Sequence, residues 1–381
     1  MTFTLYLTAE CNFKCVYCYE NFQNKMNLSS DNAYKIIDFI MHYTDEKIEI
    51  VFMGGEPLIR KELIVDIIDY INKQYSNREV IYNLTTNASL LDDDMINLFK
   101  REKFEIRLSI DGNKNTHEIN RISKNGVHYF DKIMENAHKM NRKGIPYSAR
   151  MTVTANTLKS LYENICYFHE NAINSIFIGI NCNWKMNPQE LKQFKEQLYK
   201  IKHYYISEFD KDNKLEIAQF DGRFLDIMCK FGNCFNMCSA GRDTFKIFPD
   251  LKIYPCEYVV CKEQFCIGNI NDGINTSKSI KLAYDLYDKK NNKCDSCEIK
   301  DYCFQMKCGY SNYVATGRIN IPGEQDCIVE KMYYPIVRDI LMHLAERKYE
   351  RLYFYKEYIK KNEMKLNQIG NEVFNLLKVR D

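Results

Sequence analysis

Apolar and amphipathic segments alternate through the first half of the chain. Apolar runs bounded by turn residues predict strands over six ranges: Thr2–Leu7, Lys47–Phe52, Val80–Thr85, Glu105–Ser109, Tyr147–Val153 and Ser175–Ile180. Between them, apolar residues recur three and four positions apart, which predicts helices over Asp31–Tyr43, Lys61–Gln74, Asp92–Arg101, Phe130–Arg142, Leu158–His169 and Pro188–Phe209. Strands that alternate with helices over short links are typical of an α/β fold with a parallel sheet. The periodicity fits an incomplete barrel and a doubly wound sheet equally well.

The pattern changes after about residue 215. Short strands and turns replace the long helices, and ten of the 16 cysteines lie between Cys229 and Cys308. From Met332 to Asp381 the chain is helical again and highly charged, which predicts a solvated helix pair packed on the body. We therefore expect an α/β domain over residues 1–214, a cysteine-rich domain over 215–330 and a C-terminal helical extension over 331–381.

The composition excludes several classes of function. Lys and Arg number 53 and Asp and Glu 51, so no bulk positive field points to nucleic acid or to an anionic membrane. No stretch approaches the ~20 apolar residues that span a bilayer. The N-terminal sequence MTFTLYLTAECNFKC lacks the charged start and cleavage site of a secretory signal. These features predict a cytoplasmic protein, in which 16 thiols are metal ligands or catalytic groups rather than disulfides.

A first group of cysteines follows the first predicted strand. Cys11, Cys15 and Cys18 have the spacing C-x3-C-x2-C. Three thiolates within eight residues can hold three corners of a cubane iron–sulfur cluster, which leaves the fourth iron open to a small chelating molecule. A zinc site would need a fourth close ligand, and none lies nearby in the sequence.

This cysteine group and the motifs after it resemble the radical S-adenosylmethionine (SAM) superfamily. Tyr17 fills the aromatic position of the family's C-x3-C-x-aromatic-C signature. Further motifs follow on successive strands, in the order MGGEP (residues 53–57), TTNA (85–88, where relatives carry TTNG), LSIDG (108–112), HEINR (117–121) and RMTVT (150–154). Ligand groups belong at the C-terminal ends of parallel strands, glycines let a backbone approach a ligand closely, and an arginine suits a carboxylate.

The resemblance implies a partial (β/α)6 barrel that binds SAM and a [4Fe–4S] cluster. The cluster ligands would be Cys11, Cys15 and Cys18. The SAM contacts would be Tyr17, Gly54, Gly55, Glu56, Asn87, Ser109, Arg121 and Arg150. In this family the reduced cluster cleaves SAM to a 5′-deoxyadenosyl radical, which takes a hydrogen atom from an unactivated carbon.

The second group of cysteines resembles the SPASM extension of radical SAM enzymes. Cys294, Cys297, Cys303 and Cys308 are followed by Cys327, and Cys234, Cys238 and Cys256 stand upstream. The resemblance implies two auxiliary [4Fe–4S] clusters, hence three in all. The family's interleaved pairing would place one cluster on Cys234, Cys238, Cys256 and Cys308 and the other on Cys294, Cys297, Cys303 and Cys327.

This second group departs from the family pattern in two places. Leu251 stands where the family has glycine, and four residues rather than three separate Cys303 from Cys308. Cys229 could replace Cys234, or the site could be open to substrate. On spacing alone, a pair of structural zinc ribbons is the alternative. Of the remaining cysteines, we expect Cys166 and Cys182 in the core, and Cys261 and Cys266 beside the cluster loop, where they could contact substrate.

Likeness to anaerobic sulfatase-maturating enzymes and to maturases of ribosomal peptides suggests the substrate. The segments Gln219–Gly222, Ile253–Tyr258 and Ile267–Ile270 are similar to the sulfatase maturases. There an Asp, the proposed base, follows the cluster cysteine, whereas Glu257 stands here. Glu257 could act as the base or could be a bystander that meets a Lys or Arg.

The Asp-to-Glu difference favours a peptide maturase that forms a thioether or another cross-link. A sulfatase maturase that oxidises Cys or Ser to formylglycine with Glu257 as base is the alternative. A radical enzyme acting on a small molecule, such as a sugar dehydrogenase, and a non-catalytic iron–sulfur or zinc scaffold are the other classes.

The resemblance also implies partners. These are a peptide or protein substrate and an external electron donor such as a flavodoxin or ferredoxin. The first strand begins at residue 2, so we expect leader recognition by the barrel, by the helical tail or by a separate leader-binding protein.

Overall fold

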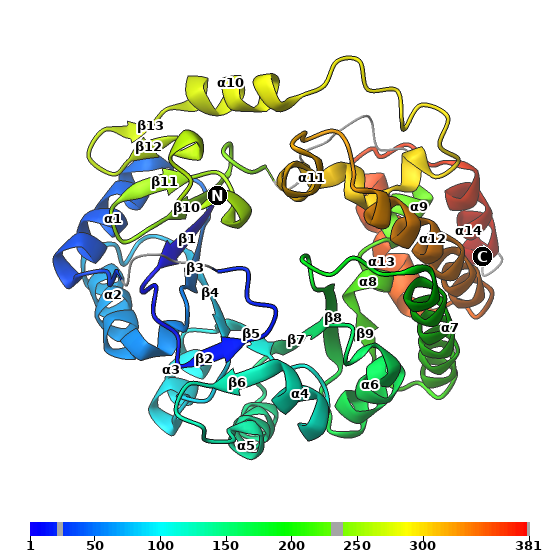
Figure 1. Cartoon of the computed structure of the whole chain (residues 1–381), viewed down its shortest axis with the longest axis horizontal. Coiled ribbons are helices and arrows are strands. Elements are labelled where there is room, and N and C mark those ends of the chain that lie inside the picture. The colour runs from blue at the N-terminus through cyan, green and yellow to red at the C-terminus, as the bar shows by residue number, and fades with distance from the viewer. Residues whose placement is uncertain (21–25, 230–238, 379–381) are drawn as a thin grey trace.

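The computed structural model describes residues 1–20, 26–229 and 239–378, and arranges them as an open ring (Figure 1). Within these residues, eleven strands form one sheet in the order β13-β12-β11-β10-β1-β3-β4-β5-β7-β8-β9. Their bounds are β1 Thr2–Tyr6, β3 Ile48–Met53, β4 Val80–Thr86, β5 Glu105–Ser109, β7 Tyr147–Val153, β8 Ser175–Ile180, β9 Glu216–Ile217, β10 Thr244–Ile247, β11 Lys252–Tyr254, β12 Gly268–Asn269 and β13 Gly273–Ile274.

The six predicted strands form the parallel part of this sheet. Strands β1, β3, β4, β5, β7 and β8 pair in parallel, each within one residue of its predicted bounds. β9 extends them at one end and β10 at the other, also in parallel. β11, β12 and β13 then continue as an antiparallel meander. The predicted α/β class is confirmed, and the sheet continues across the predicted boundary at residues 214–215.

The predicted helices cover the outer side of the sheet. They are α1 Ser30–Tyr43, α2 Lys61–Gln74, α3 Asp93–Arg101, α5 Phe130–Arg142, α6 Leu161–Glu170 and α7 Pro188–Asp210. Figure 1 shows them outside the strands, with the other face of the sheet turned toward the middle of the ring. Helices on one face only are the arrangement of a barrel, not of a doubly wound sheet. The sheet is therefore the wall of a partial barrel.

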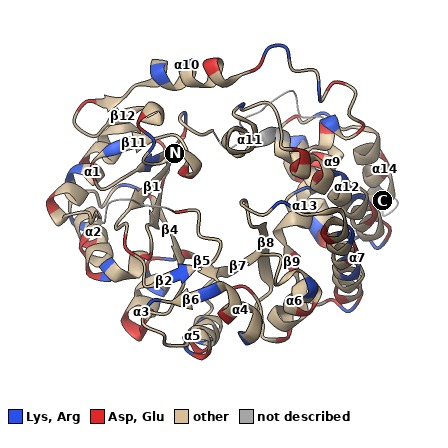
Figure 2. Ribbon diagram, viewed as in Figure 1, with Lys and Arg blue, Asp and Glu red and all other residues tan. Residues whose placement is uncertain are grey.

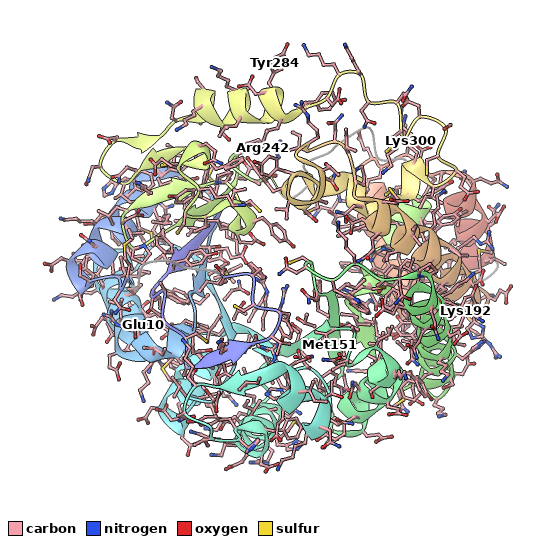
Figure 3. All side chains as sticks on the ribbon, in the orientation of Figure 1. Glu10, Met151, Lys192, Arg242, Tyr284 and Lys300 are labelled. Carbon is pink, nitrogen blue, oxygen red and sulfur yellow. The ribbon has the colours of Figure 1, made fainter. Side chains whose placement is uncertain are left out.

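The two faces of the strands differ in polarity. On β5, Ile106 and Leu108 are buried in the core, whereas the alternate residues Arg107 and Ser109 are only half-buried. On β7, buried Met151, labelled in Figure 3, likewise neighbours half-buried Arg150. Successive strand residues point to opposite faces. The inner face of the barrel is therefore polar and its outer face apolar.

Two short strands and a helix were absent from the sequence prediction. β2 (Phe13–Cys15) pairs antiparallel with β6 (Arg121–Ser123), and α4 (Lys114–Asn120) leads into β6. The pairing joins the first cysteine loop to the end of the HEINR motif. The other helices are α8 Ala218–Asp221, α9 Phe224–Met228, α10 Thr276–Leu286 and α11 Gly309–Thr316, and the 3-10 turns are Pro57–Arg60, Leu158–Ser160, Glu257–Val259, Glu263–Phe265, Lys300–Tyr302 and Phe304–Lys307.

The C-terminal extension is helical and packs on the body as predicted, but it has three helices rather than a solvated pair and is more deeply buried. Residues 324–378 form three helices, α12 (Glu324–Glu346), α13 (Glu350–Lys361) and α14 (Gln368–Lys378). α12 buries Ile336, Ile340 and Leu341 in the core cluster that also contains the barrel strands. Its apolar residues recur at helical spacing, so one stripe packs inward while the charges face solvent. This extension is part of the core.

Both positions where relatives carry glycine keep a left-handed backbone. Ala88 has φ of 55° and Leu251 has φ of 69°. Leu251 ends a tight turn in which its backbone N–H donates to the Phe248 carbonyl at 2.9 Å. Ala88 and Leu251 thus adopt the backbone conformation that glycine favours, although a side chain makes this conformation sterically unfavourable.

Charge is spread over the outside of the ring. Figure 2 shows residues of both signs on the outer helices. Tyr284, labelled in Figure 3, lies on the outer edge of α10 and is 61% exposed. In the described ranges, no helix combines the length and the apolar character that crossing a membrane requires.

Candidate active site

The first cysteine loop leaves the C-terminal end of β1 and returns along β2. Cys15 lies opposite Arg121 in the β2–β6 pair. The Cys11 sulfur accepts from the Phe13 backbone N–H at 3.3 Å, and the Cys18 N–H donates to the Cys15 carbonyl at 3.1 Å. Cys11 and Cys15 are half-buried and Cys18 is exposed.

The three thiols influence one another electrostatically. Burial raises the pKa of the Cys11 thiol to about 11, with smaller contributions from Cys15 and Cys18. Burial also raises the pKa of Cys15, which Arg121 opposes. Nowhere in the described part of the chain do three His, Cys, Asp or Glu side chains already surround one point as ligands of a single ion would. This loop is suited to an iron–sulfur cluster because it supplies three cysteine sulfur donors that lie close together in the sequence.

Gly54 and Gly55 hold the segment after β3 against the cysteine loop. A Cβ at Gly54 would lie 2.4 Å from the Thr8 carbonyl oxygen, and one at Gly55 would lie 2.3 Å from the Glu10 carbonyl oxygen. The Glu56 N–H donates to that Glu10 carbonyl at 2.8 Å. The sequence predicted that these glycines approach a ligand. In the structure, the backbone that they approach belongs to the loop carrying Cys11.

Glu56 ties the ends of β3 and β4 together. Its carboxylate accepts from the Thr86 hydroxyl at 2.6 Å and from the backbone N–H groups of Leu58 at 3.0 Å and Asn87 at 2.8 Å. The side chain is 1% exposed, and burial raises its pKa to about 7 although these hydrogen bonds oppose the rise. Glu56 thus holds the ends of β3 and β4 together from a buried position in the site.

Asn87 links β4 to the cysteine loop through two other side chains. Its amide donates to the Asn12 oxygen at 3.0 Å, and its own oxygen accepts from the Ser89 hydroxyl at 2.6 Å. The Asn12 amide donates to that hydroxyl at 2.8 Å. The three residues form a closed polar triangle between Cys11 and the end of β4.

Asp111 is the centre of a second buried network. It is 0% exposed and accepts from the Tyr17 hydroxyl at 2.7 Å, from Arg121 at 3.0 Å and from the Thr152 N–H at 2.9 Å. Arg121 lies over the Tyr17 ring at 5.4 Å, and Asp111 is the main cause of its raised pKa, against burial. The network joins the cysteine loop to β5, β6 and β7.

Ser109 and Arg150 lie side by side on the inner face. They are register partners on β5 and β7. Arg150 stacks over the ring of Phe177, its neighbour on β8, at 4.3 Å. Burial lowers the pKa of Arg150, and Arg107 lowers it further.

Glu257 follows Cys256 at the end of β11. Its carboxylate lies 3.5 Å from the Lys246 ammonium, which also donates to the Thr4 hydroxyl at 3.0 Å. The Cys256 thiol lies 3.7 Å from the same carboxylate. Burial would raise the pKa of Glu257, but Lys246 and the hydrogen bonds from the Glu257 backbone and Cys256 together lower it. Glu257 is thus an ionised carboxylate, the state required of a base, and it also meets a lysine.

The second cysteine group separates into two places. Cys294, Cys297, Cys303 and Cys327 line one hollow, which matches one predicted ligand set. Cys308 lies within electrostatic reach of Cys256, whose pKa is raised mainly by burial. Cys234 and Cys238 lie outside the described residues.

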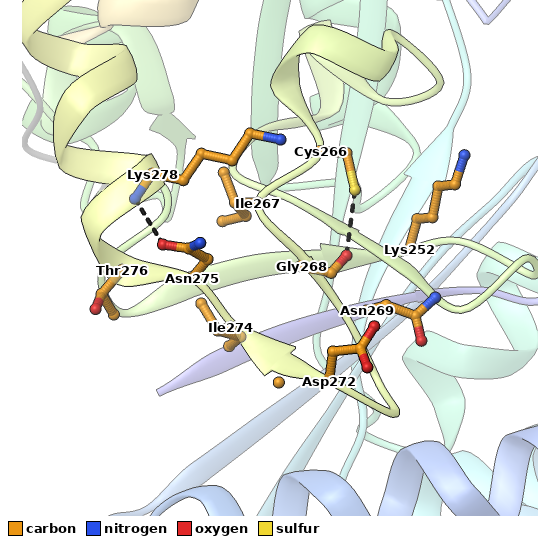
Figure 4. Close-up of a pocket in the computed structure, with 11 residues that line it drawn as sticks. Lys252, Cys266, Ile267, Gly268, Asn269, Asp272, Ile274, Asn275, Thr276 and Lys278 are labelled. Atoms are coloured by element: carbon orange, nitrogen blue, oxygen red, sulfur yellow. Dashed lines mark hydrogen bonds between the residues drawn. The ribbon is translucent and has the colours of Figure 1, made fainter.

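Two of the remaining cysteines differ from their predicted places. Cys182 is exposed on the loop after β8 and Cys166 is half-buried, so the prediction that both are core residues was wrong. Cys229 is buried in the main core. Cys266 lines a surface pocket between β11, β12, β13 and the start of α10, where its thiol donates to the Gly268 carbonyl at 3.2 Å (Figure 4). Cys261 is exposed.

Several residues of the site were not singled out from the sequence. Asp111 stands inside the LSIDG motif, and only the structure identifies it as the centre of a network. The rings of Tyr19 and Tyr258 pack at a tilt with their centroids 5.9 Å apart, and burial raises the pKa of the Tyr258 hydroxyl. Glu20 accepts from the Tyr6 hydroxyl at 3.5 Å, and burial raises its pKa to about 8. Tyr19 and Glu20 directly follow the cysteine signature, which is the signal that could have found them.

The comparisons with known proteins agree with this arrangement. Residues 5–172 match the model of the Radical SAM superfamily. A cysteine-type anaerobic sulfatase-maturating enzyme of Clostridium perfringens is 24% identical over 321 residues, which cover 78% of this chain and 85% of that protein. The radical SAM cyclopropyl synthase TigE of Paramaledivibacter caminithermalis is 22% identical over 328 residues, 80% of this chain and 67% of that one.

Two kinds of solved structure share the fold. The structure of native anSMEcpe with bound AdoMet has a TM-score of 0.73 and 20% identity, and covers 91% of this chain and 97% of that one. Streptococcus suis SuiB bound to precursor peptide SuiA has a TM-score of 0.60 and 16% identity, with coverages of 86% and 75%. The chain contains a radical SAM domain and is a radical SAM enzyme.

Proposed function

We propose that this enzyme takes a hydrogen atom from a residue of a peptidyl substrate and matures that peptide by oxidation. One observation carries the proposal. The ionised Glu257 stands on the inner face beside Cys256, within electrostatic reach of Arg150 and Tyr19 and on the same side of the sheet as the first cysteine loop. A base, an anion-binding group and a radical site would then share one surface.

The chain has suitable donors for the cofactors. Cys11, Cys15 and Cys18 would hold the [4Fe–4S] cluster, while Ser109 and Arg150 offer a hydroxyl and a guanidinium to the carboxylate of SAM. When SAM is bound and the cluster is reduced, the two together would supply the carbon radical that abstracts hydrogen. Tyr17, Gly54, Gly55, Glu56, Asn87 and Arg121 would keep the cysteine loop in place rather than all touching SAM.

Two auxiliary [4Fe–4S] clusters complete the proposal. Cys294, Cys297, Cys303 and Cys327 would hold one, and their common hollow supports this set. Cys256 and Cys308, with Cys234 and Cys238, would hold the other. Such clusters could accept the electron that remains on the substrate after hydrogen and proton are removed. A donor such as a flavodoxin or ferredoxin would supply the first electron.

Glu257 would take a proton from the substrate. Its carboxylate is charged before the reaction, so it can accept the proton of a hydroxyl, thiol or amide as the substrate radical is oxidised. Lys246 would hold the carboxylate in position and would stabilise the charged form.

The bond formed distinguishes two candidate maturases. A cross-link joins a sulfur or carbon of the peptide to another carbon with loss of two hydrogens. Formylglycine formation instead converts one Cys or Ser to an aldehyde. The position of Glu257 directly after Cys256 supports the second candidate, since the proposed base of the sulfatase maturases follows the cluster cysteine. Glu in place of Asp supports the first.

The test is a mass measurement on peptide incubated without oxygen with reduced enzyme and SAM. We expect 5′-deoxyadenosine and a peptide that has lost two hydrogens, or one whose Cys has become an aldehyde. Glu257→Gln should still release 5′-deoxyadenosine but should yield far less peptide product, and Cys15→Ala should release none. Cofactor cleavage with no change in any Cys- or Ser-containing peptide, together with oxidation of a small molecule such as a sugar, would refute the proposal.

A further inference from the structure

Two neighbouring strands carry arginines whose charges have no carboxylate partner among the residues that the structure describes. Arg107 on β5 and Arg150 on β7 are half-buried on the inner face. Within the described ranges, neither guanidinium forms an ion pair or a hydrogen bond, and the contact of Arg150 is the Phe177 ring at 4.3 Å. Residues 21–25 and 230–238 contain no Asp or Glu. The described part of the chain therefore offers these two cations almost no internal counter-ion.

The strand register gives the surroundings of each arginine. Thr85, Arg107 and Ser148 are register partners on β4, β5 and β7. Two residues farther along, Ser109 and Arg150 form the next row. Neighbouring strands lie about 4.8 Å apart, and residues two apart on one strand lie about 6.6 Å apart on the same face. Two guanidinium groups and three hydroxyl groups thus share one small area of the inner face.

The like charges of Arg107 and Arg150 repel each other in this area. Burial lowers the pKa of Arg150, and the nearby charge of Arg107 lowers it further. Glu257 lies within reach of Arg150, but its carboxylate is 3.5 Å from the Lys246 ammonium. A bound anion would remove the repulsion between the arginines. Guanidinium and hydroxyl donors are suited to a carboxylate, which can accept several hydrogen bonds at once.

One carboxylate does not account for both rows. The row with Ser109 and Arg150 is nearer the C-terminal strand ends, where the cysteine loop lies, and suits the carboxylate of SAM. Arg107, with Thr85 and Ser148 beside it, lies one pleat deeper in the barrel. The charge of Arg107 in this inner row therefore remains unneutralised when the carboxylate of SAM binds Arg150.

We propose that Arg107, flanked by Thr85 and Ser148, binds a carboxylate of the peptidyl substrate, so that the enzyme prefers peptides with an Asp, a Glu or a free C-terminus near the residue that reacts. This inference rests on the proposed function and names the substrate class of that site. The carboxylate of SAM is the competing source of the same chemistry, so SAM binding and peptide binding must be measured separately.

The experiment measures binding to the reconstituted holoenzyme with SAM and without reductant. The probes are fluorescein-labelled nonapeptides with a central Cys, in pairs that differ only by Glu or Gln beside it, or by a free or amidated C-terminus. We expect the wild type to bind the acidic member at least about tenfold more tightly, since a good charged contact is worth that much. Arg107→Gln should abolish the preference, Arg107→Lys should retain part of it, and SAM affinity should change less than about twofold in both.

Arg142→Gln is the matched control, because Arg142 is an exposed arginine at the end of α5. It should keep the wild-type preference. Equal affinity of the wild type for both members of every pair would overturn the proposal. So would an Arg107→Gln variant that keeps the preference but loses SAM affinity, since Arg107 would then serve SAM.

The binding result does not depend on turnover. Preferential binding of an acidic peptide that is never modified would contradict the proposed reaction and support the binding site. Equal modification and equal binding of acidic and neutral peptides would contradict the binding site and support the reaction. Circular dichroism of Arg107→Lys and Arg107→Gln checks that both variants fold.

Discussion

The two cysteine regions are held in place by different means. The first loop is fixed by the protein, because Glu56, Asn87 and Asp111 are almost fully buried and each makes several hydrogen bonds to or around it. In the second region, Ile299 is the one buried residue among the described side chains from 287 to 308. Short turns without a core need another source of stability. We therefore expect the first loop to keep its arrangement without a metal and the second region to need one.

Removing iron should therefore affect the two regions unequally, and this is the largest effect that we expect. In the iron-free protein, amide hydrogen exchange over residues 287–308 should be at least about tenfold faster than in the reconstituted protein, equivalent to ~1.4 kcal/mol. The barrel strands and the first loop should keep their protection. Cys303→Ser should reproduce the effect, and exposed Cys182→Ser should not. Equal loss of protection in both regions would contradict the comparison.

Asp111→Asn tests whether the first loop is fixed by its buried network. The substitution leaves Arg121 buried without its ion pair, which costs about 3–5 kcal/mol of unfolding free energy. Urea unfolding of the iron-free protein measures it. Asp131→Asn is the control, because Asp131 pairs with Lys114 at an exposed site, where solvent screens such a pair and its loss should change stability little. Similar losses in the two variants would show that the network adds little.

Glu56 makes the stability of the barrel depend on pH. Its pKa is raised from 4.5 to about 7 by burial, so between these values the folded protein keeps a proton that the unfolded chain has released. Stability should therefore fall as pH rises from about 5 to 8, by up to about 3 kcal/mol. Unfolding curves at several pH values should show this fall in the wild type and a smaller one in Glu56→Gln.

Exposed Glu46→Gln is the control for that series and should keep the wild-type pH dependence. If Glu56→Gln also keeps it, Glu56 is charged in the folded protein throughout the range.

The smallest effect concerns Ala88 and Leu251, the two left-handed residues that stand where relatives carry glycine. Replacing Ala88 or Leu251 by Gly relieves a steric cost of about 1–2 kcal/mol. It also removes apolar side-chain contacts and raises the conformational entropy of the unfolded chain, and both of these destabilise the fold. The net change in unfolding free energy should therefore be less than about 1 kcal/mol. Replacement by Val should destabilise both sites, because branched side chains tolerate this conformation least. Thermal unfolding of the four variants measures the effects. A stabilising Val at either position would contradict the assigned backbone.

The regular part of the barrel could be predicted because its signal is local. On β5 and β7, the local sequence pattern predicted the observed bounds of both strands. The pairing of β2 with β6 could not be predicted, since it joins Cys15 to Arg121, residues far apart in the sequence and in strands only three residues long. The inward packing of α12 was missed because its charges hid a narrow apolar stripe around Ile336 and Ile340.

The site was predictable in its residue types but not in its contacts. The motifs placed Gly55, Glu56 and Asn87 at strand ends, where the structure has them. That Glu56 binds Thr86 and the Asn87 backbone, rather than facing outward, depends on how β3 and β4 pack. The unpaired state of Arg107 is likewise a property of its neighbours on β4 and β7, which no local pattern reveals.

The position of β10 beside β1 has a consequence for biosynthesis. The Lys246 ammonium meets the Thr4 hydroxyl across 242 positions of sequence. A nascent chain must therefore extend beyond Ile247 before its first strand gains a neighbour on that side. Until then β1 is an edge strand, and the cysteine loop that follows it belongs to an unfinished sheet.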